Sequence, residues 1–161
     1  HIDRDQKIDS DYDFIKLRDD CERDSIALFI TKYQEIESYF CQPQHIALSC
    51  GMRIDEATRH YSQWIDELSD VTKNKLTNFI LRDRITCGTN KDGRIDIKIV
   101  KAKVDEWLST DKEYLTPGKE LLGKAKKFLQ DQNKNPMDIH NISDGLICNE
   151  FQKIIFTLTK N

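Results

Sequence analysis

Long apolar runs are missing from this 161-residue sequence. No segment approaches the roughly 20 apolar residues that a helix needs to span a bilayer. The start has neither the basic flank nor the apolar stretch of a signal peptide. With 38% hydrophobic and 33% charged residues, the composition is that of a globular protein rather than a disordered one. We therefore expect a cytoplasmic protein with a buried core and no membrane contact.

Paired cysteines and clustered histidines are missing too. The five cysteines are odd in number and contain no C-x-x-C pair. This argues against a disulfide framework and a zinc site, and for free thiols in a reducing compartment. The four histidines are scattered, and spacing pairs no cysteine or histidine into a nucleophile and its base. The segment KDGRID lacks the oxygen ladder of an EF-hand loop.

Charge is abundant but unevenly placed. The net charge is −3, yet the first 24 residues carry a strong acidic excess, whereas the segment 116–134 is rich in lysine. An acidic end and a basic helix suit a metal site beside a phosphate-binding surface. They equally suit two solvated surfaces.

The hydrophobic periodicity predicts an α/β chain that is mostly helical, with a partial sheet at its start. A strand end at Ile2–Asp5 and a buried parallel strand at Ile26–Thr31 are expected. Helical spacing then predicts helices near 12–24, 33–40, 45–50, 55–68, 71–84, 97–108, 116–132 and 149–159. Asp55 is expected to cap the helix at 55–68. The expected apolar faces are formed by Tyr33, Ile36, Tyr39 and Phe40; by Ala57, Tyr61, Trp64, Ile65 and Leu68; by Ile97, Val100, Val104, Trp107 and Leu108; and by Leu121, Leu122, Ala125, Phe128 and Leu129. A lone pair of strands is barely stable, so we expect the missing strands upstream of His1, in a larger protein. Residues 1–50 would hold the sheet and residues 51–161 the helical region, as one continuous domain fragment.

The first candidate site is Asp3 with Asp5. In a strand, residues two apart point to the same side, so both carboxylates would face one space. Such oxygen ligands select Mg²⁺ or Mn²⁺. The alternative is a solvated acidic end, because the same D-x-D spacing recurs at Asp9, Asp11 and Asp13.

The second candidate is the segment YQEIESYF. Glu37, with Glu35 beside it, follows the expected buried strand and would lie at the ligand-binding edge of an open sheet. Flanking apolar residues predict that Glu37 is partly buried, where an unpaired carboxylate is costly and a metal would offset the cost. The alternative is a glutamate on a helix surface.

The third candidate is Lys119 in TPGKELL. Thr116 is predicted to cap the helix and Pro117 to take its first position. A cation in the first turn opposes the helix dipole, so Lys119 suggests a phosphate or oxyanion site beside the backbone N–H groups. Lys124, Lys126 and Lys127 could follow a nucleic-acid backbone. The alternatives are an exposed lysine and a solvated face.

Taken in order, IDRD, a strand leading to YQEIESYF, and PGKELL resemble the Toprim domain of OLD-family nucleases and of related effectors that work with ABC-type ATPases in antiphage defence. The resemblance implies a two-metal phosphodiesterase acting on DNA or RNA. It implies Asp3, Asp5, Glu37 and, less directly, Glu35 as Mg²⁺ or Mn²⁺ ligands, with Lys119 at the scissile phosphate. It also implies an ATPase partner and a possible homodimer.

The sequence departs from that family in two respects, of which the first is that the family's ATPase portion is absent. The glutamate that ends the first Toprim strand has no counterpart here, so we expect this chain alone neither to cleave nucleic acid nor to hold metal tightly. Two other functions remain open. One is a non-catalytic helical interaction module, and the other is the Toprim domain of a primase or topoisomerase, which lacks the EIESYF and PGK pairing.

Overall fold

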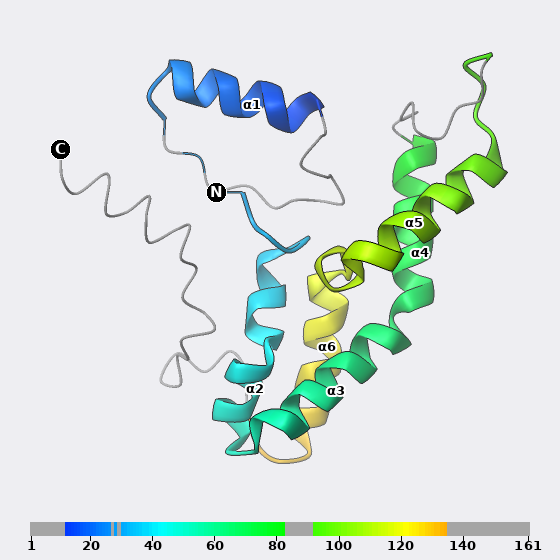
Figure 1. Cartoon of the computed structure of the whole chain (residues 1–161). Coiled ribbons are helices and arrows are strands. Elements are labelled where there is room, and N and C mark those ends of the chain that lie inside the picture. The colour runs from blue at the N-terminus through cyan, green and yellow to red at the C-terminus, as the bar shows by residue number, and fades with distance from the viewer. Residues whose placement is uncertain (1–11, 27, 29, 83–91, 135–161) are drawn as a thin grey trace.

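The computed structural model is an assembly of helices (Figure 1). It describes residues 12–26, 28, 30–82 and 92–134. Its elements are α1 (Tyr12–Arg23), the 3₁₀ helix η1 (Ile36–Cys41), α2 (Pro43–Cys50), α3 (Ile54–Glu67), α4 (Ser69–Arg82), α5 (Ile97–Leu115) and α6 (Gly118–Gln130). The prediction of a mostly helical chain is confirmed. None of the described helices combines the length and apolar character needed to cross a membrane.

The first of two cores lies between η1, α2, α3 and α6. The helical spacing predicted its two main faces correctly. On α3 the buried residues are Ala57, Tyr61, Trp64 and Ile65, with Leu68 just after the helix; on α6 they include Leu121, Leu122, Ala125 and Leu129. The short η1 packs mainly against α6, so this core joins two segments that are far apart in the sequence.

The second core lies between α4 and α5, which run side by side at the far end of α3 (Figure 1). Val100, Val104, Trp107 and Leu108 are buried there as predicted, but Ile97 is 48% exposed because the helix begins at that residue, one turn before the buried face. The helix also continues past the predicted end at Leu108. At Asp111 the backbone leaves helical geometry (φ −128°, ψ 24°), and the kink redirects the final turn that carries Lys112 and Glu113.

The predicted partial sheet is not found, because the described residues contain no strand. The described members of the expected strand Ile26–Thr31 form no regular element, and Ile26 is 59% exposed. A strand needs a neighbour that pairs its backbone groups over several residues. In the described residues only isolated bridge positions occur, at Ile30 and at Ile95. The expected strand end at Ile2–Asp5 and the expected helix at 149–159 lie outside the described residues.

Two predicted helix caps are wrong, for a shared reason. Asp55 lies in the first turn of α3, where its carboxylate accepts a hydrogen bond from the Arg53 guanidinium at 3.0 Å, and Arg53 is the N-cap residue. Thr116 does not cap α6; its hydroxyl donates to the Lys112 carbonyl at 2.8 Å and so completes the end of α5. In both cases a neighbouring group competes successfully for the side chain that the local pattern assigns to the cap.

Candidate functional site

The EIE and PGK segments, which the sequence separates widely, meet in the structure. The backbone N–H of Lys119 donates to Glu35 Oε2 at 2.7 Å across a separation of 84 residues. The Lys119 ammonium lies 3.6 Å from Glu35 Oε1, with the lysine side chain 67% exposed and the glutamate 14% exposed. Glu35 therefore places a negative charge at the N-terminus of α6, where the helix dipole favours it.

Gly118 makes this contact possible. A Cβ atom at position 118 would lie 2.6 Å from Ser38 Oγ and 2.8 Å from the Ser38 backbone nitrogen. Real Cβ atoms do not approach other atoms so closely, so only glycine lets the first turn of α6 press against η1. Pro117, just before it, is the N-cap residue of α6. The PGK segment is therefore shaped by packing against η1 as well as by helix initiation.

Glu37 and Ser38 bring polar atoms without partners into this junction. Among the described residues, Glu37 Oε2 and Ser38 Oγ are buried and have no hydrogen-bond partner. The prediction that Glu37 is partly buried is confirmed. A buried carboxylate oxygen without a donor is costly. A cation, or a hydrogen-bond donor outside the described residues, could contact this oxygen and offset the cost.

The described residues supply one possible ligand of a divalent metal, Glu37, and not a complete set of ligands. Glu37 Oε2 is an unpartnered hard oxygen, whereas both carboxylate oxygens of Glu35 face Lys119. Within the described ranges no three histidine, cysteine or carboxylate side chains converge as metal ligands. Asp3 and Asp5 lie outside the described residues, so their predicted role stays a prediction.

The three other candidate lysines of α6 do not share one environment. Lys124 points toward α3 and pairs with Glu67 at 2.6 Å, which lowers the pKa of that carboxyl. Lys126 and Lys127 are exposed. Lys126 is near enough to Cys41 to oppose the rise in pKa that burial and the charge of Glu37 cause in that thiol. Of the three lysines predicted to contact nucleic acid, Lys126 and Lys127 are thus exposed, whereas Lys124 is paired with Glu67.

A second polar cluster, which the sequence analysis missed, lies between α3 and the end of α5. Glu113 Oε1 accepts hydrogen bonds from the hydroxyls of Tyr61 at 3.2 Å and Tyr33 at 3.5 Å. The Gln42 amide donates to the Tyr61 hydroxyl at 3.1 Å and to the Ser38 carbonyl at 3.3 Å. Burial, with the charge of Glu113, raises the pKa of both tyrosines well above the usual range.

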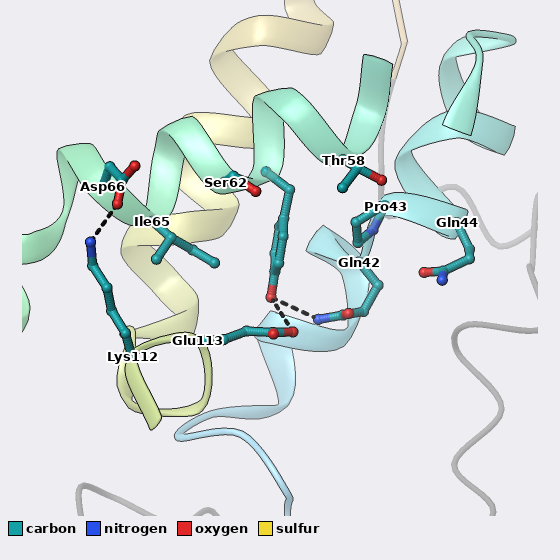
Figure 2. A pocket seen from close by; sticks show the side chains of 10 residues that line it. Gln42, Pro43, Gln44, Thr58, Ser62, Ile65, Asp66, Lys112 and Glu113 are labelled. Carbon is teal, nitrogen blue, oxygen red and sulfur yellow. Dashed lines mark hydrogen bonds and ion pairs between the residues drawn. The ribbon is translucent and has the colours of Figure 1, made fainter. Parts of the chain in front are cut away.

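Gln42, Tyr61 and Glu113 of this cluster line an open pocket of about 510 Å³. Figure 2 shows Glu113 and Gln42 below α3, and Lys112 turned away toward Asp66. The available sequence signal was indirect. Two tyrosines on predicted apolar faces need hydrogen-bond partners for their hydroxyls. The spacing of residues in the sequence does not indicate that Gln42 and Glu113 are those partners.

Comparisons with known proteins add no assignment: no protein-family model, curated protein or solved structure matches this chain.

Removing the Glu35 carboxylate is expected to destabilise the α6 contact. Glu35→Ala deletes the acceptor of the Lys119 N–H, and loss of such a cap costs roughly 0.5–2 kcal/mol of unfolding free energy. Glu35→Gln keeps an acceptor and should cost less. Urea unfolding of both variants measures the difference. Glu106→Ala is the control, since Glu106 is exposed and its one ion pair among the described residues is with Lys103 on the same helix. Equal losses for Glu35→Ala and Glu106→Ala would contradict the capping role.

Proposed function

We propose that this chain belongs to a metal-dependent nucleic-acid phosphodiesterase of the OLD-like Toprim type. The observation that carries the proposal is the contact between the EIE and PGK segments through Glu35 and Lys119. A nuclease of this type needs both segments at one place, and their sequence separation gives no local reason for them to meet. The unpartnered oxygen of Glu37 in the same junction supports the proposal further.

The proposed roles follow from where the side chains lie. Glu35 holds the backbone of Lys119, while the flexible and exposed lysine stem leaves its ammonium able to reach a phosphate oxygen and offset developing negative charge. Glu37 is the proposed metal ligand of the junction, together with Asp3 and Asp5. Mg²⁺ or Mn²⁺, when bound, would supply an activated water and stabilise the leaving oxygen. Lys126 and Lys127 would contact flanking phosphates.

The test compares variants of the longer protein that the resemblance implies, assayed with the ATPase partner that it also implies. With Mg²⁺ present, we expect cleavage of plasmid DNA or of tRNA. Glu37→Gln should reduce the rate at least about 100-fold, and Lys119→Ala should do so by roughly 10²–10³-fold, as for the loss of a single oxyanion donor. Glu106→Gln and Lys101→Ala, exposed substitutions on α5, are the matched controls and should leave the rate unchanged.

The second candidate is a non-catalytic helical interaction module. Both carboxylate oxygens of Glu35 contact Lys119, and a glutamate that only stabilises the start of a helix would make the same contacts. This observation favours the interaction module. Full activity in Glu37→Gln would reject the proposed metal ligand. Absence of cleavage of either substrate by the unaltered protein, with the partner present, would support the interaction module instead.

A further inference from the structure

We propose that the pocket between the start of α2, one face of α3 and the end of α5 binds a guanidinium group. This inference is independent of the proposed nuclease function. The pocket volume of about 510 Å³ lies within the roughly 300–1,000 Å³ typical of small-molecule sites. Three separate elements form its walls, with Gln44 at one side and Ser62 on α3 opposite Glu113 (Figure 2).

The charge of Glu113 is the first argument. Its Oε1 accepts the two tyrosine hydroxyls, whereas Oε2 makes no hydrogen bond or ion pair with any described residue. The nearest cation in the sequence is Lys112, but its ammonium pairs with Asp66 at the pocket rim (Figure 2). Both tyrosines donate as neutral hydroxyls. A half-buried negative charge therefore faces the pocket, and none of the described cations pairs with it.

The second argument is that the carboxylate of Glu113 suits a guanidinium better than an ammonium. A carboxylate offers about four lone-pair sites, and the two on Oε2 are open to N–H donors. A guanidinium presents several N–H groups in a planar fork that suits a carboxylate, whereas an ammonium is a compact point charge. The outward N–H groups could donate to the side-chain oxygens of Gln44 and Ser62, which line the same pocket. Partial burial strengthens the attraction relative to a fully exposed pair.

The guanidinium could belong to a free small molecule or to an arginine side chain of another protein. Both present the same chemistry to Glu113. Titration with L-argininamide and with the tripeptide Gly-Arg-Gly separates the two sources. Tighter binding of the peptide by about tenfold or more would favour a protein-borne arginine, and equal binding would favour a small molecule.

The decisive experiment is a calorimetric and NMR titration of the whole chain. We expect saturable binding of L-argininamide, with shifts at Tyr61 and Gln42, and no binding of L-citrullinamide, which has nearly the same shape but no charge. Glu113→Gln should weaken binding at least tenfold while still accepting the tyrosine hydrogen bonds, so that the fold is kept. Glu106→Gln should bind as the unaltered chain does.

A second variant keeps the test independent of the polar cluster. Ser62 is exposed on α3 and lines the pocket. Among the described residues, no hydrogen bond joins its side chain to Glu113. Ser62→Trp should fill the pocket and abolish binding without disturbing the tyrosine network. Equal binding of L-argininamide and L-citrullinamide, or unchanged affinity in both Glu113→Gln and Ser62→Trp, would overturn the proposal.

Discussion

Gly118→Ala is expected to destabilise the protein by about 1–3 kcal/mol, the usual cost of forcing one extra carbon into a packed contact. The added Cβ would lie 2.6 Å from Ser38 Oγ and 2.8 Å from the Ser38 backbone nitrogen. A hydroxyl can rotate away, but the backbone nitrogen cannot move unless η1 shifts. The first turn of α6 must therefore separate from η1, which also lengthens the hydrogen bond between Lys119 and Glu35.

Gly123→Ala is the matched control, because it makes the same chemical change five residues later in the same helix. Gly123 is exposed, and a Cβ there would meet no atom within 4 Å. Alanine should stabilise this helical position by roughly 0.5–1 kcal/mol. The two variants are thus expected to change stability in opposite directions in urea unfolding. A Gly118→Ala protein as stable as Gly123→Ala would contradict the close packing of α6 on η1.

The contact can be examined further with Ser38→Gly in the Gly118→Ala background. Removing the Ser38 hydroxyl relieves the nearer of the two clashes but leaves the backbone nitrogen at 2.8 Å. We therefore expect partial recovery of stability rather than complete recovery. Full recovery would show that the hydroxyl alone resists the added Cβ, and that η1 can yield.

Alkaline pH is expected to unfold the protein more steeply than its exposed groups alone would cause. The pKa of Tyr33 and the pKa of Tyr61 are both raised in the folded protein, chiefly by burial and then by Glu113. Below the unfolded pKa of about 10, both states keep the phenol protons and the stabilisation is fully present. As pH rises above that value, the unfolded state releases protons that the folded state retains. The free energy of unfolding should then fall by about 1.4 kcal/mol per pH unit for each tyrosine.

Urea unfolding between pH 8 and pH 11, in a reducing buffer, measures this effect. Tyr61→Phe should make the decline above pH 10 shallower by about 1.4 kcal/mol per pH unit, although loss of its hydrogen bonds lowers stability at neutral pH. The buried thiol of Cys41, whose pKa is also raised, contributes from about pH 8.5 upward. Cys41→Ala separates that contribution. Identical slopes above pH 10 in the unaltered chain and in Tyr61→Phe would contradict the proposed burial of the phenol.

Local patterns predicted some features of the fold well and others badly. The buried faces of α3 and α6 followed from helical spacing, because an amphipathic helix must bury its apolar side whatever it packs against. The caps at Asp55 and Thr116 were wrong because Arg53 and the Lys112 carbonyl compete for these side chains. The expected strand at Ile26–Thr31 failed because a strand is not a local structure and depends on a partner.

The candidate site shows the same division between what local sequence patterns predict and what depends on tertiary packing. The sequence by itself determined which residues are chemically unusual, namely the glutamates of EIE and a lysine in the first turn of a helix, because residue type and helix polarity are local properties. Only the tertiary structure decided that Glu35 accepts a hydrogen bond from the Lys119 N–H, that Gly118 must lack a side chain, and that Glu113 accepts hydrogen bonds from two tyrosines. Such contacts join residues tens of positions apart, and the packing that selects them depends on the shapes of whole helices rather than on any short pattern.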